Sequence, residues 1–177
     1  MTTFVALLRG INVGGNNILP MQEFRALLTN HGCEDVATYI QSGNAVFRST
    51  ASASGLSVSI ADGIEAKYGF RPAVLVLTAS GFMTIAAANP FAVPPEQENH
   101  VHISFLQRPA SRPNVARLKQ LASPSETFVL TDAAFYLHAP DGIGRSKLAA
   151  EVEKCLGVPA TGRNLRTVGR IVALLAA

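Results

Sequence analysis

The sequence predicts an α+β fold in which one arrangement of strands and helices occurs twice. Three observations support this prediction. Short apolar runs of strand length alternate with longer stretches in which apolar residues recur at helical spacing. Glycine-containing turns join pairs of strands, and the order strand, helix, strand, strand, helix can be read in each half of the chain. That order is the split βαβ, or α/β-plait, plan, so we expect two ferredoxin-like halves packed together with a C-terminal helix.

In the first half, local signals show where the elements begin and end. Pro20 suits the first turn of a helix, and His31-Gly32 suits its end. Gly43 in a short link predicts a hairpin, and Gly69 suits a helix terminus. The expected elements are strand Thr3–Arg9, helix Met21–Asn30, strands Val36–Ile40 and Asn44–Arg48, helix Leu56–Tyr68, strand Pro72–Leu77 and helix Ser80–Ala88.

The second half begins after a segment of prolines and polar residues. Asp132-Ala133 suits the tip of a tight hairpin, and Ser146 and Gly157 suit the two ends of a helix. The expected elements are strand His100–Leu106, helix Asn114–Ala122, strands Thr127–Thr131 and Ala134–His138, helix Lys147–Leu156 and a last helix over Asn164–Ala176.

The proline-rich segment is the best candidate for a domain boundary. We therefore expect a first α/β-plait half over residues 1–90, a linker over 91–99 and a second half over 100–177. Each half is shorter than about 100 residues and would be marginally stable alone, whereas two halves in contact bury more surface.

The composition excludes several classes of protein. Apolar residues make up 48% of the chain and charged residues 15%, a globular balance far from that of disordered proteins. No apolar run approaches the roughly 18 residues of a membrane span, and the N-terminus lacks the features of a signal peptide. We therefore expect a cytoplasmic protein. Cys33 and Cys155 are expected to be reduced and inert, since two cysteines do not make a disulfide framework.

The net charge of +3 comes entirely from the C-terminal part of the chain. Residues 1–139 contain nine lysines and arginines and nine aspartates and glutamates, whereas residues 140–177 contain six and three. Such a block favours an anionic partner, although a solvated cationic helix end has the same composition. Arginine outnumbers lysine eleven to four, and its planar guanidinium suits bidentate contacts to phosphate or carboxylate.

Four ordered motifs carry a resemblance to a known family. They are Leu8–Gly15, Tyr39–Asn44, Gly144–Leu148 and Thr161–Thr167. With these motifs the chain resembles, from its first strand to its last helix, the bacterial family called domain of unknown function 1697. The resemblance implies two α/β-plait halves and brings no established activity, cofactor or catalytic residue. Asn16 and Gly162 depart from the family pattern, which has lysine and threonine there, and Gly162 takes away a hydroxyl next to Arg163.

The loop after the first strand is the first candidate ligand site. Gly10 and Gly15 have the spacing of the P-loop glycines, but Asn16 and Asn17 occupy the lysine and Ser/Thr positions, so a Walker-type NTPase is rejected. An anion-binding loop remains, because glycines allow close backbone approach and asparagine offers an amide. Its candidate residues are Arg9, Gly10, Asn12, Gly14 and Gly15. A plain strand–helix connection that needs positive φ angles would use the same residues.

The hairpin tip Gln41–Asn44 is a second candidate, with Ser42 and Asn44 as its polar side chains. In a split βαβ half we expect the end of the first strand and the end of the second to lie at opposite edges of the sheet. That placement would separate Arg9 from Ser42. Plain turn chemistry explains the same composition.

A third candidate is the start of the helix near residue 147. Arg145, Ser146 and Lys147 stand there, where positive side chains are electrostatically unfavourable. A bound anion would compensate that conflict.

A fourth candidate is the basic segment before the C-terminus. Arg163, Asn164 and Arg166 are expected to open the last helix. Arg163, Arg166 and Arg170 would then share one helical face, at spacing i, i+3 and i+7.

The sequence gives little support for a metal site or for nucleophilic catalysis. His100 and His102 alternate on one strand with Glu98 nearby, but no cysteine completes a zinc set, so no metal site is expected. Neither a G-x-S-x-G motif nor a cysteine in a catalytic context is found. The sequence therefore names no catalytic residue and no cofactor, and does not decide whether the protein is an enzyme.

The leading hypothesis is a protein that binds a small phosphorylated or otherwise anionic ligand, in a pocket where residues 9–17, 142–147 and 163–170 converge. A nucleic-acid-binding module is one alternative, less favoured because the chain has no Trp and its strand aromatics follow no RNP-like pattern. A protein-interaction domain is the other, with the apolar end Ile171–Ala177 docking on a partner or on a second copy. No membrane partner is expected, and the oligomeric state stays open.

Overall fold

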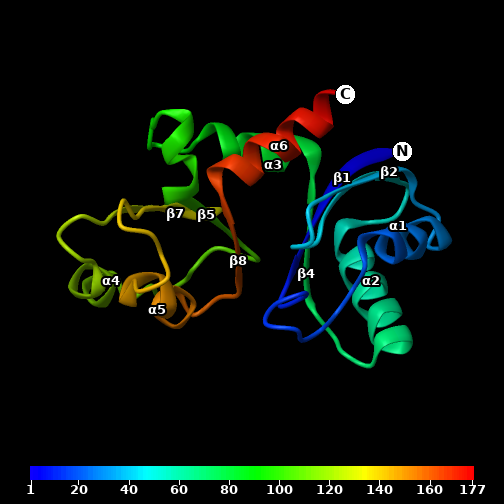
Figure 1. Cartoon of the computed structure of the whole chain (residues 1–177), viewed down its shortest axis with the longest axis horizontal. Coiled ribbons are helices and arrows are strands. Elements are labelled where there is room, and N and C mark those ends of the chain that lie inside the picture. Colours follow the sequence, from blue (N-terminus) through cyan, green and yellow to red (C-terminus); the bar gives the residue numbers. More distant parts are fainter. The chain divides into compact units, whose positions relative to one another are not determined.

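The computed structural model describes all residues from 1 to 177 and shows two compact units (Figure 1). Unit 1 comprises Met1–Met83 together with Arg170–Ala177, and unit 2 comprises Thr84–Gly169. Each unit contains a four-stranded sheet with helices, and a further helix ends the chain. The predicted α+β class, with two ferredoxin-like halves and a C-terminal helix, is therefore confirmed.

Unit 1 has the element order expected from its sequence. The elements are β1 (Thr2–Arg9), α1 (Met21–Asn30), β2 (Glu34–Tyr39), β3 (Asn44–Ser49), α2 (Ala53–Tyr68), β4 (Ala73–Thr78) and the first residues of α3 (Ala79–Ala87). The strands lie in the order β2-β3-β1-β4, and each neighbouring pair is antiparallel. β1 is thus a central strand, and because its residues from Phe4 to Leu8 are all buried, the sheet is covered on both faces along this strand.

Unit 2 repeats this plan. A 3₁₀ helix, η1 (Pro95–His100), occupies much of the segment that was expected to be a linker. The further elements are β5 (Val101–Leu106), α4 (Val115–Leu121), β6 (Thr127–Leu130), β7 (Ala134–His138), α5 (Lys147–Leu156), β8 (Ala160–Asn164) and the start of α6 (Leu165–Ala176). The sheet order β6-β7-β5-β8 matches that of unit 1 strand for strand.

Strand β8 corrects the sequence-based prediction, which missed it and placed the start of the last helix at Asn164. Residues Ala160–Asn164 include a glycine and show little apolar alternation, so their local preference for a strand is weak. Pairing with β5 decides their conformation, with Leu106 opposite Ala160 and Ile103 opposite Arg163. Arg163 therefore lies on a strand and does not share a helical face with the arginines that follow it.

The core of unit 1 lies between one face of its sheet and helices α1 and α2. Phe4, Ala6 and Leu8 face this core, since side chains alternate along a strand. Helix α1 contributes Phe24 and α2 contributes Ile60, both fully buried. Burial of a side chain of this size contributes about 1.5–3 kcal/mol. This packing holds the carboxyl end of β1 in a defined place.

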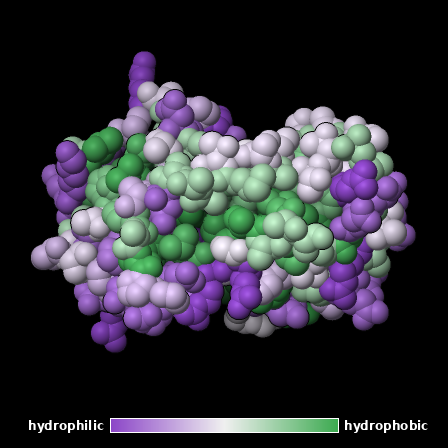
Figure 2. Space-filling model, turned by 90° about the horizontal axis from the view of Figure 1, so that it is seen from above, coloured by the Kyte–Doolittle hydropathy of each residue, from purple (hydrophilic) through white to green (hydrophobic).

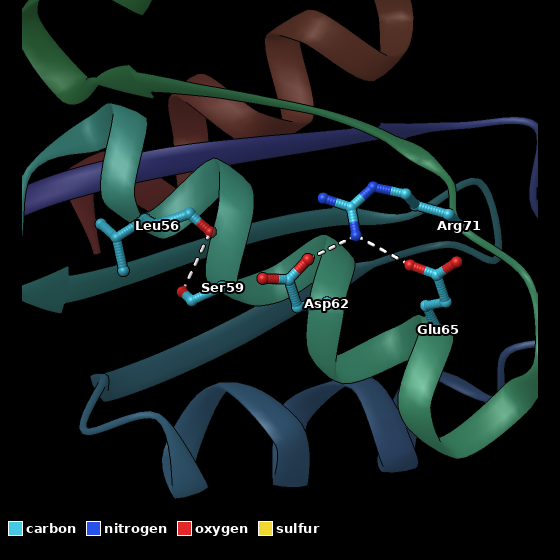
Figure 3. Close-up of polar contacts among 5 residues, drawn as sticks. All are labelled: Leu56, Ser59, Asp62, Glu65 and Arg71. Atoms are coloured by element: carbon cyan, nitrogen blue, oxygen red, sulfur yellow. Dashed lines mark hydrogen bonds and ion pairs between the residues drawn. The ribbon is translucent and has the colours of Figure 1, made fainter.

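Helix α2 also makes polar contacts at its start and on its exposed side. The Ser52 hydroxyl accepts a hydrogen bond from the Gly55 N–H at 3.1 Å and caps the helix. Arg71 contacts the carboxylates of Asp62 and Glu65, the latter at 2.8 Å (Figure 3). Because these three side chains are about half exposed, the ion pairs add little stability. Core packing therefore holds α2 against the sheet.

The core of unit 2 is built in the same way. Phe135 and Leu137 of β7 pack against Leu118 of α4 and against Leu148 and Val152 of α5. The residues that alternate with them on β7 lie on the other face of the sheet. The two faces of this sheet therefore carry different side chains.

Hydrophobic side chains also reach the surface, and Figure 2 shows them beside hydrophilic ones on one face. In unit 1, Val13, Ile18 and Ile40 are 67%, 54% and 47% exposed. Val13 and Ile18 belong to the connection between β1 and α1, and Ile40 belongs to the β2–β3 turn. Both connections thus present apolar side chains to solvent.

Candidate functional site

The carboxyl end of β1 and the turn of the β2–β3 hairpin lie at the same edge of the unit 1 sheet. Leu7 pairs with Asn44, and the Leu8 N–H donates to the Gly43 carbonyl oxygen at 2.8 Å. The sequence-based prediction placed Arg9 and Ser42 at opposite edges, and it is wrong. Both β1 and β2 run antiparallel to β3, so they run parallel to each other and end at one edge.

The connection after β1 is a compact loop with its own hydrogen bonds. The Asn12 N–H donates to the Asn17 carbonyl at 3.1 Å, and the Asn17 amide donates to the Gly10 carbonyl at 2.8 Å. At its tip, Gly14 and Gly15 have φ angles of 57° and 76°. Positive φ at both central residues is what a type I′ turn requires, so these glycines are needed for backbone conformation.

The side chain of Asn12 joins this loop to the hairpin. Its Nδ2 donates to the carbonyl oxygens of Leu19 at 2.9 Å and Gln41 at 2.8 Å, and its Oδ1 accepts from the Leu19 N–H at 2.8 Å. Both amide hydrogens are therefore used within the protein. In this structure Asn12 holds the loop in place.

The hairpin turn is equally constrained. A Cβ atom at Gly43 would lie 2.7 Å from both Leu8 Cβ and Ile11 Cδ1, so a larger residue fits there only if these neighbours or the hairpin move. The fully buried Asn44 donates from Nδ2 to the Tyr39 carbonyl and to the Ser42 hydroxyl, both at 2.9 Å. These bonds set the position of Tyr39 at the end of β2.

Tyr39 lies on the sheet face opposite α1 and α2. It pairs with Asn44, which pairs with Leu7, and Leu7 alternates with the core residues of β1. On this face a hollow of about 390 Å³ is lined by Tyr39 and by Arg170, Ala173 and Leu174 of α6. We call it the α6 hollow. All four residues belong to unit 1.

Arg170 is the cation of the α6 hollow. It is exposed and has no carboxylate within ion-pair distance. Arg170, Ala173 and Leu174 have the spacing i, i+3 and i+4, which places them on one helical face. An arginine without a carboxylate partner in a concave site can bind an anion.

In unit 2, Arg145 and Lys147 are exposed at the start of α5. The Ser146 hydroxyl accepts from the Ala149 N–H at 3.0 Å, which confirms Ser146 as the helix cap. The first turn of α5 contains no acidic residue. The electrostatic conflict expected at this helix start is therefore found, and anion binding there stays a prediction.

Arg163 is only 9% exposed, on the face of the unit 2 sheet opposite α4 and α5. Its Nη1 donates to the Gly162 carbonyl at 2.8 Å. Burial lowers the pKa of its guanidinium to about 10, so the group keeps its charge at neutral pH. Because α5 packs on the other face, Arg163 and this helix lie on different sides of the sheet.

The other two predicted residues of this segment contribute to local structure. The Asn164 side chain accepts from the Thr167 N–H at 2.9 Å near the start of α6. Arg166 donates from Nη2 to the Pro95 carbonyl at 3.2 Å. Their roles in ligand binding stay predictions.

The structure contains no group of three His, Cys, Asp or Glu side chains that could hold a metal ion. Burial lowers the pKa of His102 and raises the pKa of the Cys33 thiol. A raised thiol pKa disfavours the reactive thiolate at neutral pH. None of the helices is long and apolar enough to cross a membrane.

Among the candidate ligand-binding residues, sequence reasoning missed Tyr39, Ala173 and Leu174. The i, i+3, i+4 spacing after Arg170 was visible in the sequence as one helical face. No local signal shows that this face meets the end of β2, because residues 39 and 170 are brought together only by the fold.

Two ferredoxin-like units, with a glycine-rich loop bonded to a hairpin turn in the first, define the class of this protein. The family described as "Protein of unknown function (DUF1697)" matches residues 1–136. The chain belongs to this family, which confirms the resemblance seen in its motifs. The motifs at 144–148 and 161–167 lie beyond the matched residues.

A solved structure supports the fold over nearly the whole chain. It is that of the conserved bacterial protein SP0830 from Streptococcus pneumoniae, with 25% sequence identity and a TM-score of 0.66. The likeness covers 98% of this chain and 98% of that protein. Comparison with curated proteins found no match.

Proposed function

We propose that this protein binds a small phosphorylated or otherwise anionic ligand in the α6 hollow. The observation that carries the proposal is that Arg170, without a carboxylate partner, lines a concave site together with Tyr39. An arginine in such a site recognises phosphate or carboxylate through a planar, bidentate fork.

The size of the α6 hollow limits the ligand. Its volume of about 390 Å³ lies at the lower end of the roughly 300–1,000 Å³ range of small-ligand sites. A ligand between a phosphorylated sugar and a mononucleotide in size would fill it. A dinucleotide cofactor would extend far beyond it.

The glycine and asparagine motifs of the first half act as a frame for this site. Asn12 bonds the 10–17 loop to the hairpin, and Asn44 bonds to the carbonyl of Tyr39. Gly43 permits the close approach of the hairpin to β1. A frame held by such bonds keeps the backbone of Tyr39 in one position and so lowers the ordering cost of binding.

The alternative functions have weaker support. Single-stranded nucleic acids stack on aromatic side chains exposed on a plait sheet. Here Phe4 and Phe47 are part of the unit 1 core, and Phe135 stacks with Phe128 in unit 2. In the apolar end of the chain, Ile171 is buried, so only part of that segment is accessible to a protein partner.

Calorimetric titration tests the proposal. Wild-type protein, Arg170→Gln and Arg112→Gln would be titrated with inorganic phosphate and ribose 5-phosphate at low salt. Arg112 is an exposed arginine without an ion pair, so its variant matches the charge change away from the site. We expect binding to wild type and Arg112→Gln and a loss of about tenfold or more in Arg170→Gln, as removal of a charged hydrogen bond gives.

Two results would overturn the proposal. One is that neither anion binds to wild type at low salt. The other is that Arg170→Gln binds both anions as tightly as wild type does.

A further inference from the structure

We infer that the ligand of the α6 hollow is a nucleoside monophosphate, whose base stacks on the Tyr39 ring and whose phosphate binds Arg170. The inference rests on the proposed function and names the chemical class of the ligand. The four side chains that line the hollow supply an aromatic ring, an apolar surface and one positive charge.

Tyr39 forms the aromatic side of the α6 hollow. Tyr39 is partly exposed, and its hydroxyl makes no hydrogen bond within the protein. Its backbone carbonyl is held by Asn44 at 2.9 Å, and Ile40 beyond it has a φ angle of 49°. That angle is rare for a β-branched residue and turns the chain sharply at the end of β2. The backbone that carries the ring is thus held at the strand end, and the partly exposed ring can stack with a planar group.

Ala173 and Leu174 of α6 supply the apolar side chains of the hollow. Both residues come from the helix face that also carries Arg170, so α6 adds apolar side chains to the hollow that Tyr39 of β2 also lines. The small side chain of Ala173 leaves room where a longer residue would reach toward Tyr39. A base that enters between an aromatic ring and an aliphatic wall removes both of its apolar faces from water.

The charge of the hollow limits how many phosphate groups its ligand carries. Its lining contains one cation and no carboxylate. One guanidinium matches one phosphate group, and the lining offers neither a second cation nor a carboxylate for Mg²⁺. These features favour a monophosphate over a nucleoside triphosphate.

The affinities of related compounds test the inference by calorimetry. Wild-type protein would be titrated with AMP, CMP, adenosine, ribose 5-phosphate and inorganic phosphate. We expect the affinity for AMP to exceed that for ribose 5-phosphate by about tenfold or more, because base–aromatic stacking adds to the phosphate contact. Tyr39→Leu should reduce AMP binding to the level of ribose 5-phosphate, whereas Tyr39→Phe should keep it.

A spectroscopic arm separates stacking from a structural effect of the substitution. The chain has three tyrosines and no tryptophan. With ¹³C-labelled tyrosine rings, AMP should shift the Tyr39 signal through its ring current and leave those of Tyr68 and Tyr136 in place. Ala173→Leu fills the hollow while Tyr39 and Arg170 stay unsubstituted, and it should abolish both the shift and AMP binding.

The outcomes distinguish the inference from the proposed function. Equal affinity for AMP and ribose 5-phosphate, with Arg170→Gln still losing both, would overturn the nucleotide inference and leave anion binding intact. Absence of binding by every phosphate compound would overturn both. If Tyr39→Leu unfolds by circular dichroism, the Tyr39 shift in wild type and its loss in Ala173→Leu decide the question.

Discussion

The Nδ2 atom of Asn12 donates a hydrogen bond to the carbonyl oxygen of Gln41, 2.8 Å away, and joins the loop after β1 to the β2–β3 turn. The two residues are 29 positions apart in the chain. Because this bond links two connections at one sheet edge, it makes a single rigid frame from two exposed segments.

Replacement of Asn12 should destabilise the protein. Asn12→Ala leaves the buried Leu19 N–H and two carbonyls without their partner, and places alanine at a φ angle of 52°. We expect a loss of about 2–3 kcal/mol in the free energy of unfolding, measured by urea denaturation. Asn16→Ala is the matched control, since Asn16 makes one long bond at 3.4 Å, and it should change stability by less than about 0.5 kcal/mol. Equal losses in both variants would contradict the role of Asn12.

Replacement of Gly43 tests close packing separately from backbone strain. Gly43→Ala and Gly15→Ala both place alanine at positive φ, 80° and 76°, so both carry a similar conformational cost. Only at Gly43 does the new Cβ meet other atoms, at 2.7 Å. We expect Gly43→Ala to lose about 1–3 kcal/mol more than Gly15→Ala in urea denaturation. Similar losses would mean that the hairpin moves away from β1 at no cost.

Acidification should destabilise unit 2 through His102. Burial lowers the pKa of this imidazole, and its Nε2 has no hydrogen-bond partner. Below its ordinary pKa of about 6.5 the unfolded chain binds the proton more readily than the folded chain, so stability falls as pH falls through this range. The slope of unfolding free energy against pH between 8 and 5 should be flatter in His102→Gln than in wild type. An unchanged slope in His102→Gln would assign the effect to other groups.

The two ends of α5 should respond oppositely to one charge reversal. Lys147 is the first residue of the helix and Lys154 lies in its last turn. Lys147→Glu should raise the free energy of unfolding by about 0.3–1 kcal/mol, and Lys154→Glu should lower it by a similar amount, because of the helix dipole. Thermal unfolding with added phosphate extends the test. Phosphate that stabilises wild type but not Lys147→Glu would support the anion site predicted at this helix start.

Most secondary structure could be predicted because its signals are local. Ser146 and Gly157 mark the ends of α5, and both act as caps in the structure. The short link with Gly43 indicated a hairpin, which is formed between β2 and β3. Strand β8 could not be predicted, because five residues with a glycine carry little preference of their own and become a strand by pairing with β5.

The sequence by itself determined the α+β class, the repeated order of elements and the family, because periodicity, caps and turn residues act over a few neighbouring positions. Only the tertiary structure decided that Asn12 meets Gln41, that Arg163 is buried on a strand and that Arg170 lies beside Tyr39. These placements depend on strand order and on which helix covers which sheet face. Such choices are made by contacts between distant parts of the chain, and no local pattern of residues encodes them.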